Sequence, residues 1–397
     1  MANAETNRIF AKNSVMERLR IEKLGPLGNV DVKFGDLTII VGPQASGKSV
    51  FLETLKLADD REFIVSTLER YGFILGHKPK KILDAYFGQG MSAMWTNETR
   101  VTTDNRQFLL DTLIKDVPEE TKPHVFYVPA QRVVCMADGY PRNFGDFLPT
   151  TPYVVREFSE ILRKFFYFGL AEKKKIFPVP EHLKGLQKKA FDNTIFHGAK
   201  LIVDEFQGQY RMKLDIDGLH VPFMAWSAGQ KEFIPLFLTI YCLQGPTTNL
   251  IQRDAYNTVI IEEPEMGLHP RAIISVLQQI LDLMQSGYKV IISTHSSVVM
   301  EFAWAFNTLR NNSTDFNRAI CNLFNVRPES SVGRMLSGIE SKTVKAYLFD
   351  NNSDNIVTST DISRLDVASD VLAESAWGGI AEFSSRVNTT VANYLRQ

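Results

Sequence analysis

The sequence predicts an α/β fold with a mainly parallel core sheet, an antiparallel β subdomain near the N-terminus and a helical insertion. Three apolar runs rich in β-branched residues, at 37–41, 258–261 and 289–293, have the length and composition of buried strands. Each run is followed within a few residues by a stretch with helical spacing of apolar residues. Residues 18–24 and 29–34 instead alternate between apolar and polar side chains across a Gly-Pro turn, which predicts a hairpin.

The remaining elements follow in chain order. The pattern predicts a helix at 62–75, short strands at 82–87 and 93–101, and a buried strand at 124–129. Residues 151–191 are predicted to be helical and basic. The further predictions are a hairpin at 200–217, an apolar helix at 233–243, a last hairpin formed by 343–349 and 356–359, and a closing helix at 381–395.

The composition limits the classes of protein to which the chain could belong, but it does not indicate a binding partner. The 397 residues allow two or three domains, and 44 Lys and Arg nearly balance 45 Asp and Glu. Cys135, Cys242 and Cys321 are scattered, which indicates reduced thiols without a disulfide framework or metal site. No apolar run is long enough for a membrane span, and the polar N-terminus shows no secretory signal, so we expect a cytoplasmic protein.

A glycine-rich loop between the strand at 37–41 and the following helix fits the phosphate-binding pattern G-x-x-x-x-G-K-[ST]. Its glycines let the backbone close around a phosphate, and its N–H groups and the helix N-terminus face the anion. Lys48 supplies a positive charge, and the Ser49 hydroxyl is placed to bind Mg²⁺. The predicted nucleotide-binding residues are Gly42, Pro43, Gln44, Ala45, Ser46, Gly47, Lys48 and Ser49.

Paired carboxylates follow the strand at 258–261. Glu262 is expected to hold Mg²⁺, and Glu263 to polarise the attacking water. Alone, such a pair could equally be solvated side chains at a strand end, but the upstream phosphate loop favours the catalytic interpretation. A similar stretch at 201–205 also ends in Asp-Glu, but it lies within an alternating hairpin and we interpret it as structural.

Two further turns are candidate parts of the site. His295 directly follows the strand at 289–293, at the sheet edge where nucleotides bind, and could reach the γ-phosphate. Ser227, Gly229 and Gln230 lie in a turn of small and polar residues that opens the helix at 233–243 and could cradle a second phosphate. That turn fits best against a nucleotide held by another subunit.

The order of these four motifs resembles the ABC-type ATPase superfamily, and Leu-His-Pro after Glu-Pro-Glu resembles the overcoming-lysogenization-defect (OLD) group with its SMC- and RecF-like relatives. The resemblance covers about residues 15–360 and implies a head-to-tail dimer that binds and hydrolyses ATP with Mg²⁺. It further implies that Ser227 and Gly229 contact the partner's γ-phosphate, that Gln131 senses Mg²⁺ and water, and that 266–269 line the dimer seam. Three positions depart from the common pattern: Gln44, Ala228 and Glu262.

The basic stretch 163–189 carries eight Lys and Arg residues with interleaved aromatic side chains. It resembles a nucleic-acid-binding arm, but a solvated helix with an aromatic core face has the same composition, and we favour that interpretation. The acidic residues near the C-terminus are interpreted as solvated loops rather than the metal cluster of a Toprim nuclease domain; they are Asp350, Asp354, Asp361 and Asp366.

We therefore expect four parts: an N-terminal ATPase lobe (1–140), a basic helical insertion (141–195), a C-terminal ATPase lobe (196–360) and a helical tail (361–397). The expected function is a dimeric or larger ATP-driven switch without membrane contact, regulating a separate effector such as a nuclease in anti-phage defence. The alternatives are a RecF-like DNA-repair ATPase, a scaffold that binds ATP with little turnover and, disfavoured by the Leu-His-Pro form, a transporter subunit.

Overall fold

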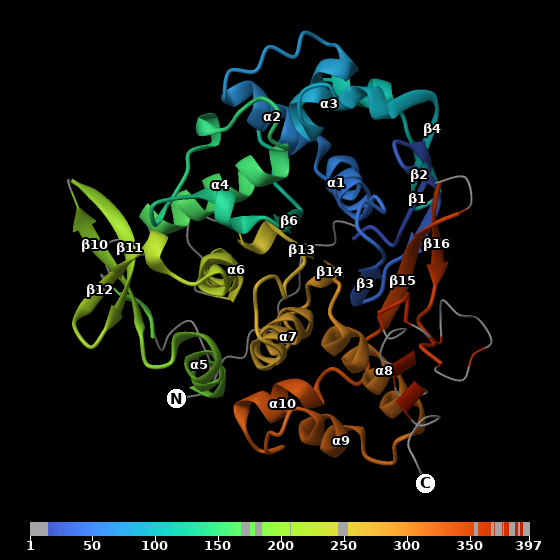
Figure 1. Cartoon of the computed structure of the whole chain (residues 1–397). Coiled ribbons are helices and arrows are strands. Elements are labelled where there is room, and N and C mark those ends of the chain that lie inside the picture. The colour runs from blue at the N-terminus through green and yellow to red at the C-terminus, as the bar shows by residue number, and fades with distance from the viewer. Residues whose placement is uncertain are drawn as a thin grey trace, which may run out of the picture.

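A ten-stranded mixed sheet runs through the whole molecule (Figure 1). The computed structural model describes residues 15–366 except 168–174, 179–184, 207, 245–252 and 353–355, with scattered positions up to 391. The strands in spatial order are β5 (Arg106–Phe108), β4 (Trp95–Thr103), β1 (Arg18–Leu24), β2 (Leu27–Lys33), β16 (Val357–Asp361), β15 (Val344–Asn351), β3 (Leu37–Val41), β14 (Lys289–Ser293), β13 (Thr258–Glu262) and β6 (Val125–Val128).

The strands β15, β3, β14, β13 and β6 pair in parallel with their neighbours and form the core of the sheet. Their residues alternate between two hydrophobic clusters: Ile39 and Ile292 face one, while Ile40 and Ile291 face the other. Because both faces are covered, the centres of these strands are runs of apolar residues instead of alternating apolar and polar residues. The predicted α/β fold with a mainly parallel core sheet is confirmed.

Helices cover both faces of this sheet (Figure 1). The cluster that contains Ile40 is completed by α1 (Lys48–Asp59), α2 (Arg61–Arg70), α3 (Pro79–Phe87) and the start of α4 (Tyr153–Phe165). The cluster that contains Ile39 is completed by the rest of α4, α5 (Gly185–Phe191), α6 (Ala228–Gln244), α7 (Pro270–Gln285), α8 (Ser297–Asn312), α9 (Phe316–Leu323) and α10 (Ser331–Ser337). None of the described helices is long and apolar enough to cross a bilayer.

Two smaller sheets lie outside the core. An antiparallel sheet is formed by β9 (Lys175–Phe177), β10 (Lys200–Phe206), β11 (Gln209–Ile216) and β12 (Leu219–Pro222), and β7 (Met136–Ala137) pairs with β8 (Tyr140–Pro141). The hairpin predicted at 200–217 is thus confirmed. Asp204, within its first strand, forms an ion pair with Lys213 of the second, which supports the interpretation of this Asp-Glu stretch as structural.

The antiparallel strands near the N-terminus do not stand apart from the core. The β1–β2 hairpin is continuous with it, because β2 pairs in parallel with β16, which pairs antiparallel with β15. Strands from the beginning and the end of the chain therefore share one sheet. This arrangement brings Leu27 of β2 against the phosphate loop that follows β3.

Two predictions are wrong. Within the stretch 151–191, which was expected to be helical, residues 175–177 form the strand β9, which pairs with β10. Residues 82–87 were expected to be a strand, but they lie in α3, which begins at Pro79 and buries Ile82, Leu83, Tyr86 and Phe87 on one face. Leu83, Tyr86 and Phe87 follow Ile82 by one, four and five positions, a spacing that places the four side chains on one face of a helix. Proline is also favoured at a first helical position. The closing helix expected at 381–395 lies largely outside the described residues.

Candidate active site

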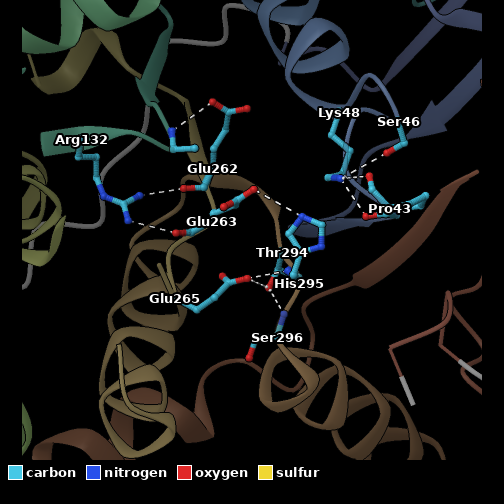
Figure 2. A network of polar contacts seen from close by, with 12 residues as sticks. Pro43, Ser46, Lys48, Arg132, Glu262, Glu263, Glu265, Thr294, His295 and Ser296 are labelled. Atoms are coloured by element: carbon cyan, nitrogen blue, oxygen red, sulfur yellow. Dashed lines mark hydrogen bonds and ion pairs between the residues drawn. The ribbon is translucent and has the colours of Figure 1, made fainter. Parts of the chain in front are cut away.

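Four predicted parts of the site, not including the Ser227 turn, lie at the carboxyl ends of four neighbouring parallel strands. In the order β3, β14, β13 and β6, these ends lead into the phosphate loop, His295, the Glu262–Glu263 pair and Gln131. Carboxyl ends of parallel strands meet at one sheet edge, the usual place for ligand binding in α/β proteins. The tertiary structure therefore brings together residues that lie more than 200 positions apart in the chain (Figure 2).

Close packing of the phosphate loop explains two of its glycines. A Cβ atom on Gly42 would collide with the carbonyl oxygen of Phe349 in β15, and one on Gly47 would lie 2.5 Å from Leu27 Cδ2. Gly47 also has a φ of 72°, a left-handed conformation that glycine adopts without steric cost, and it is the N-cap of α1. The loop is thus held between β2 and β15 with its backbone exposed toward the sheet edge.

Lys48, the first residue of α1, is buried and turned back toward the loop (Figure 2). Its Nζ atom donates hydrogen bonds to the carbonyl oxygens of Gly42 (2.9 Å) and Pro43 (2.8 Å). Burial lowers the pKa of Lys48, while the charges of Glu263 and Glu262 oppose this shift. The ammonium group therefore lies within electrostatic reach of both carboxylates.

Glu262 ends β13 with a carboxylate that is only 5% exposed. Burial raises its pKa, while hydrogen bonds from the Ser49 hydroxyl and the Ala130 N–H act in the opposite direction. The Ala130 N–H donates to Oε2 at 3.3 Å. A buried carboxylate beside the Ser49 hydroxyl provides the hard oxygen donors that Mg²⁺ prefers, so these residues fit that cation.

Glu263 adopts a left-handed backbone conformation, with a φ of 43°. A non-glycine residue in this region costs of order 1–3 kcal/mol and persists only where its surroundings hold it. Its N–H donates to the Ser293 carbonyl oxygen at 2.9 Å, and its Oε1 lies 3.5 Å from His295 Nε2. Both side chains are about one-third exposed, so they are accessible to a ligand at the sheet edge.

Glu265 fixes the loop that carries His295, a role that motif reading missed. Its Oε1 accepts hydrogen bonds from the Thr294 hydroxyl (2.7 Å) and the His295 N–H (2.6 Å). The Thr294 N–H in turn donates to the Ile40 carbonyl oxygen of β3 at 3.0 Å. The third glutamate of the Glu-Glu-Pro-Glu run thereby ties the end of β14 to the loop after β13.

Arg132 is the second functional residue that the sequence did not single out. It lies in a 3₁₀ turn (η3, Arg132–Cys135) after β6, and its guanidinium is fully buried. Figure 2 shows it between the two strand ends, donating to the backbone carbonyl oxygens of Glu262 and Glu263. The sequence signal for it is its place four residues after a buried strand, in the stretch Tyr127–Arg132 whose end resembles that of the OLD group. The neighbouring Gln131 is exposed, beside the Ala130 N–H that contacts Glu262.

The turn Ser227–Gln230 is the N-terminal cap of α6. The Gln230 N–H donates to Ser227 Oγ (3.3 Å), and the Ser227 N–H donates to Gln230 Oε1 (3.1 Å), the reciprocal pattern of a capping box. Gly229 packs so closely on the backbone of Gly267 that a Cβ atom would collide with the Gly267 carbonyl oxygen. The turn and the loop 266–269 are therefore one surface, defined here as the seam surface.

The two parts of the seam surface differ in their position: the loop 266–269 directly follows Glu265, which contacts His295, whereas the Ser227–Gln230 turn opens α6. Figure 1 shows α6, which begins at this turn, on the β6 side of the sheet and α1 on the β3 side. Ser227, Ala228, Gly267 and His269 are exposed. The structure thus brings together all predicted site residues except Ser227, Gly229 and Gln230.

Some residues of the basic stretch and of the acidic C-terminal set have local partners. Arg163 and Lys164 both form ion pairs with Glu160 of the same helix. Lys173, Lys174 and Lys184 lie outside the described residues, as does Asp354. Asp361 accepts a hydrogen bond from the Ser363 N–H.

Residues 149–301 match a family model described as an AAA domain, putative AbiEii toxin of a type IV toxin–antitoxin system. Over 82 residues the chain is 35% identical to the Old nuclease of Escherichia phage P2, a stretch that covers 21% of this chain and only 14% of that nuclease. The chain is thus similar to this AAA-domain family over residues 149–301 and to a short part of the Old nuclease.

Solved structures similar to the chain include an SMC head bound to the C-winged helix domain of ScpA, with 14% identity, a TM-score of 0.38, and 87% of this chain and 97% of that chain covered. Another is the SMC head domain from Thermotoga maritima, with 12% identity, a TM-score of 0.35, and 87% and 98% covered.

Proposed function

We propose that this chain binds ATP with Mg²⁺ at the sheet edge and hydrolyses it. The observation that carries the proposal is the convergence of Lys48, a buried carboxylate beside Ser49, and the Glu263–His295 pair on one edge of the parallel sheet. A cation for the phosphates, oxygen ligands for a metal and a base for water are the groups that phosphoryl transfer to water requires.

Each residue then has a distinct role. The loop N–H groups and Lys48 bind the phosphates, and Ser49 and Glu262 hold Mg²⁺, which would neutralise charge on the phosphate oxygens. Glu263 accepts a proton from the attacking water, His295 orients Glu263 and reaches toward the γ-phosphate, and Gln131 senses metal and water. The left-handed conformation of Glu263 supports a special role, because strained backbones cluster at functional sites.

Turnover is proposed to occur in a head-to-tail dimer or larger oligomer. Ser227 is exposed on the seam surface and Gly229 is half-buried beside it, at the start of a helix that lies away from α1, which supports a contact with the nucleotide of a second subunit. The N-terminus of α6 adds N–H groups suited to a phosphate.

The biological role we propose is regulation of a separate effector, such as a nuclease, in anti-phage defence. The support is the local similarity to a part of the Old nuclease. Co-expression with the product of the adjacent gene, followed by affinity purification with and without ATP, tests this role. Failure of an adjacent nuclease to bind in either state would remove the support for it.

Phosphate release from ATP tests the catalytic proposal. Glu263→Gln should lower the rate on the order of a hundredfold, the scale of general base catalysis, while leaving ATP bound. Asp204→Asn is the control, because Asp204 is also a carboxylate of an Asp-Glu or Glu-Glu pair that follows an apolar run, but it lies within β10 of the small sheet and is paired with Lys213. Equal rates in both variants would refute the assignment of Glu263.

A further inference from the structure

We propose that Arg132 is a positioning residue that couples the seam surface to the carboxylate of Glu263. This inference rests on the proposed function and deepens it, because it identifies a physical connection through which association of two subunits would influence hydrolysis within each. Arg132 itself does not face the ligand edge; it acts through the backbone of the residues that do.

Arg132 contacts both sides of the connection at once. Its Nη1 donates to the Glu262 carbonyl oxygen at 2.9 Å, and its Nη2 donates to the Glu263 carbonyl oxygen at 3.1 Å. On the other side, Nε donates to the carbonyl oxygen of Glu232 in α6 at 3.0 Å, and the Arg132 N–H donates to Glu232 Oε2 at 3.1 Å. One planar group therefore joins the end of β13 to the first turns of α6.

The hydrogen bonds of Arg132 are rigid because its guanidinium is buried and cannot exchange them for hydrogen bonds to water. Its side chain is fully buried, and a buried charge that loses its hydrogen bonds is strongly unfavourable. Burial lowers the pKa of Arg132, while the charge of Glu232 opposes this shift. The five N–H donors of arginine have a fixed planar geometry, so a shift of the acceptors on one side forces a shift on the other.

Each end of the connection leads to a functional element. Glu232 lies one helical turn beyond the Ser227–Gln230 cap, whose Gly229 rests on Gly267. At the other end, Arg132 holds the carbonyl of Glu263, whose φ of 43° orients the side chain toward His295. When a partner's nucleotide engages Ser227, a displacement of the start of α6 reaches the Glu263 backbone through Arg132.

Arg132→Lys tests the inference, because lysine keeps the charge but carries its donors on one nitrogen, which cannot reach the acceptors on both sides as Nε, Nη1 and Nη2 do. We expect ATP affinity and ATP-dependent association to stay within about twofold, while the single-turnover rate falls at least tenfold. Arg156→Lys is the matched control. Arg156 is also buried and donates only to backbone carbonyls, those of Leu148, Pro149 and Thr151, away from the site.

The dependence of the rate on protein concentration separates coupling from a merely structural role. In the wild type, the rate per subunit should rise as subunits associate; in Arg132→Lys, association should persist but the rise should disappear. A variant that keeps the rise would overturn the proposal. If Arg132→Lys does not fold, Glu232→Ala replaces it, since it removes the side-chain oxygen that accepts from the Arg132 N–H and the charge beside the guanidinium. An unchanged rise in that variant would likewise overturn coupling. A wild type without any hydrolysis would instead refute the proposed function.

Discussion

Gly229→Ala is a sharp test of the seam surface, because it adds one methyl group where the structure leaves no room. The new Cβ would lie within 3.0 Å of the Gly267 carbonyl oxygen, closer than real Cβ atoms approach. The obstacle is backbone, not the flexible end of a side chain, and Gly267 itself has a φ of 71°. Gly229 needs no left-handed conformation, so the substitution tests whether there is room for a methyl group and adds no backbone strain.

The expected magnitude follows from the overlap. An extra methyl group in a tightly packed place costs about 1–3 kcal/mol. We expect the protein to relieve this strain by separating the cap of α6 from the loop 266–269. A coupling energy of this size corresponds to about a 5- to 150-fold change in affinity. We therefore expect ATP-dependent association to weaken at least fivefold, while ATP binding by the monomer is unchanged because the phosphate loop is elsewhere in the sheet.

Light scattering with and without ATP, on the Glu263→Gln background, measures the association. Gly145→Ala is the control, because a Cβ atom there meets nothing within 4 Å and the glycine has no left-handed φ. Equal association of the two variants would refute the assignment of the seam surface. Loss of monomer ATP binding in Gly229→Ala would show that the turn serves the phosphate loop of its own chain.

Three further predictions can be tested. Lys48→Ala should abolish ATP binding in a fluorescent-nucleotide titration, because the loop loses its cation; unchanged affinity would place the nucleotide elsewhere. Ser227→Arg should block ATP-dependent association through its bulk, with monomer binding retained in the same titration. Lys56 forms ion pairs with both Asp60 and Glu157, and burial raises the pKa of Glu157 to about 7 from 4.5. The folded state therefore retains a proton that the unfolded state loses, so urea unfolding should show stability falling by on the order of 3 kcal/mol as pH rises from about 4.5 to 7. Burial also raises the pKa of Asp59 to about 7, so Glu157→Gln should lessen the fall without abolishing it. An equally steep fall in the variant would contradict the pKa assignment of Glu157.

The sequence by itself determined the strands of the core and the order of the site motifs. Runs such as 37–41 and 258–261 consist almost wholly of apolar residues without alternation, so their composition predicts that both faces of the strand are buried. The glycine-rich loop and the Glu262–Glu263 pair each consist of adjacent residues at a strand end, which is why a local pattern could predict them. The segment 82–87 failed because a short apolar run fits either a helix or a strand.

Only the tertiary structure decided how these pieces connect. Arg132 bonds to carbonyl groups of residues 130 or so positions away, and such backbone contacts leave no trace in a local pattern. The contact of Gly229 with Gly267 likewise cannot be predicted from a local pattern. Nor can the hydrogen bonds that Glu265 accepts from Thr294 and His295, because they depend on the order of the strands in the sheet. Strand order is set by long-range pairing, and no single segment of the chain encodes it.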